Sequence, residues 1–414
     1  MWKKTNKSDE TTRIDSRMVV NRGEVAKNVT VGSGGSLVIM CGGKAKDTIV
    51  SSGGEIVVAA GGTIKRTTIG CGAEVIIRYG AKALETEVEK GGMIRVNNDG
   101  IVKGISIQSG GVVTINGRAL ATGINAAQGA RLHFAVTSVS HIQGTVNGSA
   151  FDVKDGRISD YTVEPGNGLT VSDKCIADRI SIKRHGDFYV ESGGTATNIV
   201  AEEKSVISFD VAPNTCLQGT SNGCSFDIKD TFLSSHTILN GGMVKVFDGG
   251  VINDIRMIGP EKESIETKAG NREGFLQVEY DGLVNNLDVS GGYVDVDGGA
   301  VNKAALHYGK VVVGGAVNSI DIGGSGTLEV FNNGTVISAE SFGKMTVHSG
   351  GVIIRNTISD GTLVVRNGGT VNEATLFGGK ITVSSGGTVL KIDDWGGEIE
   401  IENGARVVCV DKHK

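Results

Sequence analysis

The sequence predicts an all-β fold, a single elongated parallel β-helix (β-solenoid) with about 18–19 residues in each coil. Three observations predict it: glycine recurs at a fixed period, aliphatic residues keep their place between the glycines, and proline is almost absent. The chain has 64 glycines and 3 prolines in 414 residues, whereas an ordinary protein has about 7% glycine and about 5% proline. Sharp corners need the positive φ that glycine adopts freely, and strands paired on both edges exclude proline because it lacks an N–H group.

The repeat is most regular over positions 25–131, where its period is about 19 residues, and a polar N-terminal tail or cap, positions 1–24, precedes it. Two aliphatic columns, beginning at Leu37 and Ile39, run through the repeat without a polar break. The residues between them vary freely, which is the in-and-out alternation of a β-strand. The repeated glycines are Gly34, Gly53, Gly72, Gly91, Gly110 and Gly129. Because a unit of this size cannot enclose a core alone, stacked copies must share one, as in a solenoid.

Residues 132–273 form a looser stretch that we expect to continue the β-helix with irregular turns. The segment 143–155 reappears at 218–230, and this offset of about 75 residues is close to four coils of the repeat. Both copies contain the motif Phe-Asp-x-Lys-Asp, at Phe151 and Phe226. We interpret the motif as a special corner, with phenylalanine inside and the acid capping a turn, or alternatively as a repeated ligand contact.

A second regular array occupies positions 274–414, with a period of about 17–18 residues. It follows a charged stretch, residues 260–273, that we expect to protrude as a loop. The columns of this array predict that Val347 points inward, while the neighbouring Thr346 points outward. The last coil is acidic, and we expect it to cap the open end of the solenoid, because an uncovered strand edge promotes aggregation.

Composition excludes several classes of protein. With 41 Lys and Arg against 46 Asp and Glu, the net charge of −5 gives no electrostatic footprint for nucleic acid. No apolar run approaches the ~18 residues of a membrane span, so we expect no membrane insertion by this chain. The six cysteines contain no C-x-x-C pair. We expect mostly free thiols, although Cys216 and Cys224 are close enough in sequence to close a small loop.

Candidate catalytic residues are few. Asp295 and Asp297 flank the inward Val296 and therefore point outward together, at a spacing that the carboxylate pair of a glycosidase also shows. Any two neighbouring outward positions on a strand satisfy this spacing, so we assign no catalytic residue. The densest acidic surface is expected at the C-terminal end, at Asp393, Asp394, Trp395, Glu398, Glu400 and Glu402.

Metal and cofactor signatures are absent from the sequence. The seven histidines are scattered without metal-binding spacing, and His133 is expected to point outward between Leu132 and Phe134. The Asp-rich turns match neither the EF-hand nor the calcium-binding nonapeptide, and Asp and Asn beside glycine are ordinary turn formers. We therefore predict no metal ion and no cofactor.

The repeat contains the motif G-G-x-[LIV]-x-V-x-x-G-G-x-[VA], for example at residues 53–64 and 378–389. This motif resembles the AIDA-type repeat of bacterial autotransporter adhesins, over roughly residues 25–131 and 274–408. The resemblance implies a right-handed β-helical passenger region that is displayed on the cell surface, mediates adhesion or self-association, and can carry O-linked glycans. The implied partners are a host-cell or bacterial surface glycan or protein, a second copy of the chain, and a glycosyltransferase.

Two features depart from that family. No apolar core follows the polar N-terminus, so we expect no Sec-type signal peptide, and the C-terminal residues lack the alternating strands of a translocator barrel. A cell-surface or extracellular location therefore rests on the resemblance, and a cytoplasmic one stays open. The alternative function is that of a carbohydrate-active β-helix enzyme, a polysaccharide lyase or hydrolase, with its site in the irregular middle of the chain.

Overall fold

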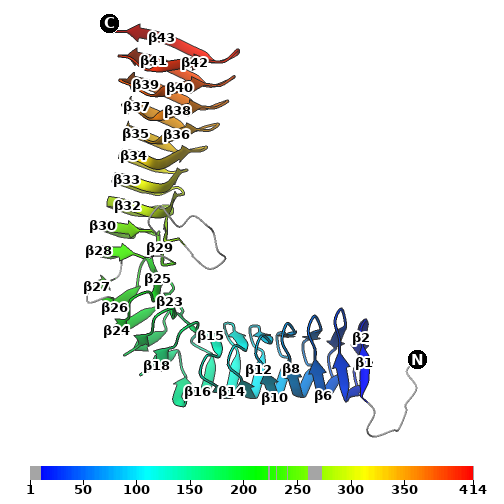
Figure 1. Ribbon diagram of the computed structural model, residues 1–414. Coiled ribbons are helices and arrows are strands. Elements are labelled where there is room, and N and C mark those ends of the chain that lie inside the picture. Colours follow the sequence, from blue (N-terminus) through cyan, green and yellow to red (C-terminus); the bar gives the residue numbers. More distant parts are fainter. Residues whose placement is uncertain (1–10, 222–223, 230, 240, 260–272, 414) are drawn as a thin grey trace. The chain divides into compact units, whose positions relative to one another are not determined.

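The computed structural model describes residues 11–221, 224–229, 231–239, 241–259 and 273–413, and every regular element in these ranges is a β-strand. The chain divides into two compact units, the first made of residues 1–205 and 219–223, the second of residues 206–218 and 224–414. Within each unit, successive strands stack mostly in parallel, coil upon coil (Figure 1). The predicted parallel β-solenoid is confirmed.

Unit 1 begins with coils that alternate a four-residue and a seven-residue strand. The shorter strands are β2 (Arg17–Val20), β5 (Ser36–Ile39), β7 (Glu55–Val58), β9 (Glu74–Ile77), β11 (Met93–Val96) and β13 (Val112–Ile115). The longer ones are β6 (Lys44–Val50), β8 (Thr63–Ile69), β10 (Lys82–Val88), β12 (Ile101–Ile107) and β14 (Leu120–Ala126), preceded by the short β1 (Thr12–Ile14), β3 (Val25–Lys27) and β4 (Val29–Val31). Leu37 lies opposite Ile56, and Ile56 opposite Val75, all fully buried. The predicted columns are therefore the core.

The paired glycines of the repeat meet two different constraints. Gly53 has a φ of +74° and its N–H donates to the Gly72 carbonyl in the next coil, at 3.0 Å. Gly54 closes the turn by donating to the Ser51 carbonyl, at 2.8 Å. A Cβ on Gly54 would lie 2.7 Å from the Val31 carbonyl oxygen, closer than real Cβ atoms approach. The first glycine is thus needed for its conformation and the second for space.

A further corner interrupts the seven-residue strands, at residues with left-handed backbone. Asp47, Arg66 and Glu85 occupy successive coils there, with φ of 54°, 51° and 51°. Arg66 Nε donates to Asp47 Oδ1 at 2.6 Å, and this hydrogen bond holds the pKa of Asp47 below its usual value. The sequence did not predict this corner, because positive φ normally goes with glycine or asparagine.

The rest of unit 1 contains an antiparallel hairpin. In β16–β17, Thr145 lies opposite Ala150, and the turn residues Asn147 and Gly148 have φ of 49° and 80°. Two positive φ values are typical of the tight hairpin turn that Asn-Gly favours. The strands are β15 (Arg131–Val136), β16 (His141–Val146), β17 (Ser149–Val153), β18 (Arg157–Ser159), β19 (Thr162–Val163), β20 (Gly168–Val171), β21 (Ile176–Asp178), β22 (Ser181–Ile182), β23 (Asp187–Val190) and β24 (Thr195–Ala201).

Unit 2 begins with shorter strands and continues as a regular stack. The first strands are β25 (Val206–Val211), β26 (Cys216–Ser221), which contributes residues to both units, β27 (Cys224–Lys229), β28 (Phe232–Ile238), β29 (Met243–Val246), β30 (Val251–Ile258) and β31 (Phe275–Val278). The stack continues through β32 (Leu283–Val296), β33 (Ala300–Val313), β34 (Ala316–Val330), β35 (Thr335–Ser341), β36 (Lys344–Val347), β37 (Val352–Ile358), β38 (Thr362–Val365), β39 (Thr370–Leu376), β40 (Lys380–Val383), β41 (Thr388–Asp394), β42 (Glu398–Ile401) and β43 (Arg406–Lys412). The second copy of the duplicated segment also takes part in antiparallel pairing, between its own β27 and the following β28.

The duplicated Phe-Asp-x-Lys-Asp motif is part of these antiparallel segments. Phe151 is buried and stacks on Phe134, with ring centroids 5.4 Å apart, and Phe226 is likewise buried. The inward phenylalanines are as expected. Of the two acids of the first copy, Asp152 does not cap a turn, because it lies within β17 and its Oδ1 is 3.4 Å from His141 Nε2. Asp155 lies in the turn that follows, with a φ of 52°.

Val347 points inward as predicted, opposite Val330 and Val365 in the adjacent coils. Its neighbour Thr346 does not reach solvent, however, since it is 4% exposed. Thr346 lies opposite the larger Glu329 and Val364, and these side chains cover it. The expectation that Thr346 is a solvent-facing position is therefore corrected.

The inward residues of the last described coil are partly exposed. Ile401 is 49% exposed and Val410 is 36% exposed, whereas their counterparts one coil earlier, Val383 and Ile392, are fully buried. The acidic side chains of this coil flank the apolar residues without covering them, so the expected cap is not formed by the described residues. Much of the predicted N-terminal cap (1–10) and charged loop (260–272) lies outside the described residues.

A charge placed in the inward column should unfold the C-terminal array. We expect Val347→Asp to lower the free energy of unfolding by more than ~4 kcal/mol, because the carboxylate would be buried without a partner. Thr362→Asp, at an exposed position on β38, should change it by less than ~0.5 kcal/mol. Urea denaturation followed by circular dichroism measures both. A difference below ~1 kcal/mol between the variants would contradict the column assignment.

Asn356 offers a stabilising change. This residue is 3% exposed, neither polar atom of its amide has a hydrogen-bond partner, and it lies between Ala339 and Ala374 in the core ladder. Asn356→Leu should raise the free energy of unfolding by about 1–3 kcal/mol, because it removes unpaired buried polar atoms. The control, Asn302→Leu, should lower it, since Asn302 donates to Asn285 at 2.7 Å. A destabilised Asn356→Leu would show that the amide is satisfied.

Candidate functional site

One corner of unit 2 brings four chemically different residues into a row. Asp297, Gly314, Phe331 and His348 follow the ends of β32, β33, β34 and β36. Their backbone N–H groups bond to the preceding coil in the same way, for example Gly314 to the Val296 carbonyl at 2.8 Å and His348 to the Val330 carbonyl at 2.8 Å. The solenoid register therefore places them at successive steps along the corner.

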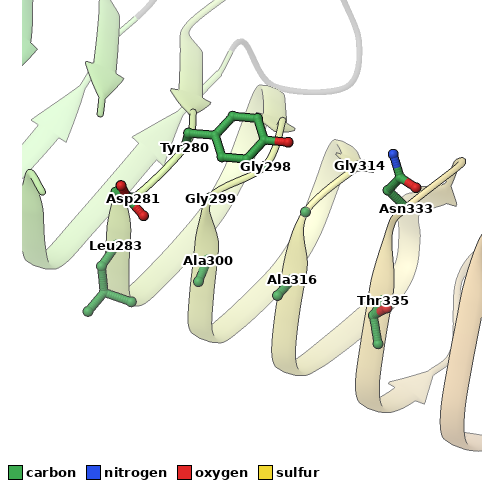
Figure 2. Close-up of a pocket in the computed structure, with 12 residues that line it drawn as sticks. Tyr280, Asp281, Leu283, Gly298, Gly299, Ala300, Gly314, Ala316, Asn333 and Thr335 are labelled. Carbon is green, nitrogen blue, oxygen red and sulfur yellow. The ribbon is translucent and has the colours of Figure 1, made fainter. Parts of the chain in front are cut away.

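This corner contains a surface depression, because several of its residues have small side chains or none. A depression of about 480 Å³ extends from Tyr280 to Asn333, with glycines and alanines between them (Figure 2). Tyr280 is 77% exposed, and its ring lies so close to Gly298 that a Cβ there would be 2.9 Å from it. The floor residues are Gly298, Gly299, Ala300, Gly314, Gly315 and Ala316. The hollow exists because two successive turns lack side chains while their neighbours keep them.

A second hollow, of about 660 Å³, shares Gly314 with the first and contains the aromatic face of Phe331. The rings of Phe331 and His348 stack with centroids 4.0 Å apart and planes at 7°. One face of Phe331 is thus covered by His348, and Gly314 follows on its other side in the row. Phe331 remains 37% exposed. An uncovered aromatic face next to a glycine is a surface on which a ligand can stack.

Carboxylates line the side of this hollow opposite Phe331. Asp295 is half-buried and Asp297 is exposed, so the predicted outward positions of both are confirmed. Partial burial raises the pKa of Asp295, and the nearby carboxylates of Asp297 and Glu279 raise it further. Burial lowers the pKa of His348, which keeps this imidazole neutral at pH 7. Two carboxyl groups thus line one side of the hollow, and Arg366, which follows β38 one step beyond His348, lines its other end.

The geometry is that of a binding surface more than of a catalytic one. A glycoside hydrolase places its two carboxylates on opposite sides of the scissile bond. Asp295 and Asp297 instead lie side by side at the end of one strand, and the hollow is open to solvent. Among the residues that the structure describes, no group of three or more His, Cys, Asp or Glu side chains could hold a metal ion.

The sequence did not single out Tyr280, Gly314 or Phe331. The sequence does contain one sign of the hollow, which is that the coils become shorter there. Asn285, Asn302 and Asn318 form a hydrogen-bonded ladder, and successive members are 17 and then 16 residues apart in sequence. A change in coil length at a Gly-Gly turn indicates a local notch. The chemistry of the notch depends on which side chains flank it in neighbouring coils, and this requires the register.

The acidic residues near the C-terminus do not form one surface. Asp394 is 8% exposed, so its predicted place on the acidic surface is wrong; its Oδ1 accepts hydrogen bonds from the N–H groups of Gly396, at 3.0 Å, and Gly397, at 3.1 Å. Lys380 pairs with Glu398 at 2.8 Å and with Glu400 at 2.9 Å. Most of these carboxylates are therefore paired with other groups of the protein.

Trp395 belongs to a stack of rings at the same end of unit 2. Its ring lies between those of Phe377, at 6.1 Å, and His413, at 3.9 Å.

Elsewhere, His133 lies between buried Leu132 and Phe134, as predicted. His236 packs against Phe209, with ring centroids 4.9 Å apart, and burial lowers its pKa to about 4.

The cysteines are described in part. Four are reduced thiols: Cys41, Cys71, Cys175 and Cys409. Cys175 is buried, which raises its pKa, and the other three are exposed. The side chain of Cys224 lies outside the described residues, so the suggested Cys216–Cys224 loop stays a prediction. In the described part of the chain there is no helix long and apolar enough to cross a membrane.

Comparison with known proteins finds a family model that matches part of the repeat. Residues 18–73 match the family model of AIDA, the adhesin of the bacterial autotransporter system, described as a probable stalk. The predicted AIDA-type resemblance is confirmed by this match. A solved structure, the TibC-catalyzed hyper-glycosylated TibA55-350 fragment, is 19% identical over 94% of this chain and 100% of that chain, with a TM-score of 0.25. The curated proteins include no match to this chain.

The buried Asp394 predicts a pH-dependent C-terminal coil. The hydrogen bond from Gly396, with that from Gly397, holds its pKa below the ordinary value, so its contribution is complete at pH 7 and is lost as the pH falls through the folded-state pKa. We expect Asp394→Ala to lower the free energy of unfolding by about 1–2 kcal/mol at pH 7 and by much less near pH 2.

Urea denaturation at the two pH values measures this effect. Asp393→Ala is the matched control, because Asp393 is only partly covered and interacts with Lys391 through a surface ion pair of 2.9 Å. Its effect at pH 7 should be clearly smaller than that of Asp394→Ala, because solvent screens a surface pair. An Asp394→Ala effect that is equal at both pH values would show that shape, and not charge, makes this residue stabilising.

Proposed function

We propose that this chain is a structural and adhesive β-solenoid that is displayed on the cell surface and binds through many repeated weak contacts. The observation that carries the proposal is the regular stack of coils, in which the same outward positions recur at each step. The family description of residues 18–73 as an adhesin stalk supports it. A stalk needs stiffness along its axis, and stacked coils with continuous hydrogen bonding supply it.

The outward side chains suit repeated contact. On the shorter strands of unit 1, Ser36 donates to Glu55 at 3.3 Å, and Arg95 pairs with Glu74 at 2.9 Å. These are mixed polar groups, at least partly exposed, of the kind that contribute little individually. Affinity from such a surface grows with the number of coils engaged, because linked weak contacts act together as avidity. The partners we propose are a surface glycan or protein, or a second copy of the chain.

The turns also offer hydroxyl groups for modification. Ser33, Ser52 and Ser109 are exposed beside the corner glycines of the repeat. We propose that a glycosyltransferase acts on such positions, so that sugars cover the corners and leave the core untouched. Intact-mass measurement of the chain from its natural source tests this, because each added hexose increases the mass by a fixed amount. A mass equal to that of the bare sequence would contradict it.

The enzyme alternative places its site in residues 132–273. The two hollows described above lie between Tyr280 and Asn367, outside that stretch, and both are open to solvent. They give the enzyme alternative no support.

Deletion of whole coils tests the adhesive function. Beads that carry the full chain, or chains shortened by one, three and five whole repeats within residues 36–130, are compared for aggregation. We expect a graded loss, because each coil removes a similar share of the weak contacts. Each shortened chain is first checked for strand content by circular dichroism. The control is a deletion of half a repeat, which breaks the register. Unchanged aggregation after five repeats are removed would contradict the proposal.

A further inference from the structure

The row of residues along the notched corner of unit 2 contains a gap of defined width. Gly314 has no side chain, so nothing fills the space between Asp297 on one side and Phe331 on the other. These two residues are two coil steps apart in the row, and each step is ~4.8 Å. The gap is therefore about 10 Å from backbone to backbone. We call it the Asp297–Phe331 slot.

This width suits a small cation held between an aromatic ring and a carboxylate. An ammonium or guanidinium group attracts a ring face from within about 6 Å of its centroid. A charge-assisted N–H···O bond to a carboxylate adds about 2.8 Å. Together the two contacts span about 9 Å, close to the width of the slot. The Phe331 face is held flat by its stacking on His348, with centroids 4.0 Å apart, so the ring is already oriented for such a contact.

The carboxylates around the slot have no close cationic partner among the described residues; Arg366 also lines the hollow, but it follows β38, one step beyond His348 in the row. Glu279, Asp295 and Asp297 make no ion pair of 4.0 Å or less with the described lysines and arginines, although the nearby Glu329 pairs with Lys310 at 2.9 Å. Their mutual repulsion raises the pKa of Asp295 beyond what burial alone does. A cation between these carboxylates and Phe331 would relieve the repulsion, whereas a neutral sugar would leave it.

We propose that the Asp297–Phe331 slot binds the ammonium or guanidinium group of a lysine or arginine side chain on a partner protein. The exposed ring of Tyr280 lies on the other side of Asp297, over Gly298, and offers a second aromatic surface to the same basic segment. This local site goes beyond the proposed adhesive function, because one pocket with defined chemistry binds here, independently of avidity along the repeats.

A larger side chain at Gly314 would fill the slot, and this provides a test of the proposal. A Cβ on Gly314 would meet the Val296 carbonyl oxygen at 3.6 Å and Asp297 Oδ1 at 3.7 Å, which are ordinary contacts. Gly314→Leu should therefore fold normally and block the slot. The matched control is Gly324→Leu, because a Cβ on the exposed Gly324 would meet only the Phe342 carbonyl oxygen, at 3.8 Å.

The experiment measures binding of hexalysine and hexaarginine peptides to the full chain by isothermal titration calorimetry. Wild type and Gly324→Leu should bind equally. Gly314→Leu and Asp297→Asn should bind at least about tenfold more weakly, because contact with the charged wall is lost. Phe331→Leu, which keeps apolar bulk without the ring, should lose about threefold. Circular dichroism and bead aggregation of all four variants should match wild type, which separates this site from the adhesive function.

Three results would overturn the proposal. Equal binding by Gly314→Leu and Gly324→Leu would show that the peptides are held by diffuse surface charge. Binding of neutral maltohexaose that is lost in Phe331→Leu, without binding of the basic peptides, would make the slot a glycan site. Tighter binding of free spermidine than of hexalysine would point to a small polyamine as the ligand in place of a protein side chain.

Discussion

The rest of this structure depends on one constraint, the in-register hydrogen bonding of each coil to the coils before and after it. Because backbone groups of Gly53 and Gly72 must meet in adjacent turns, the coils of this regular array repeat the same corners. The inward positions are then shared by these coils, and a single apolar column such as Leu37–Ile56–Val75 forms a continuous core. Outward side chains are released from this constraint, which is why they vary while the core does not.

The same constraint creates the candidate site. When a coil is shortened at its Gly314-Gly315 turn, the register of the strands on either side is kept, and the missing side chains leave a gap in an otherwise filled corner. Asp297 and Phe331 then face the gap from neighbouring coils. A solenoid can in this way carry a local pocket on a repetitive surface, without altering its core. An adhesive function through repeats and a specific contact at one corner are thus compatible within one chain.

Where sequence reasoning failed, the reason lies in contacts that span coils. Asp394 follows the periodicity of an acidic surface, yet two backbone N–H groups draw it into the turn. Thr346 alternates correctly with Val347, but the larger side chains beside it in adjacent coils cover it. The corner at Arg66 was missed because its left-handed conformation is held by the stack and not by a glycine. The Asn147-Gly148 hairpin, by contrast, had a recognisable local signal.

The sequence by itself determined the class of fold, the period of the coils and the inward columns, because these follow from glycine spacing and from the alternation of apolar residues along each strand. It also placed Asp295 and Asp297 on the outside. The tertiary structure alone decided which outward residues are neighbours. Phe331 stacks on His348 and leaves its other face towards Gly314, since the register sets residues one coil apart in sequence beside one another. A site on the surface of a solenoid is formed by residues from several coils, and these residues become neighbours only when the coils stack.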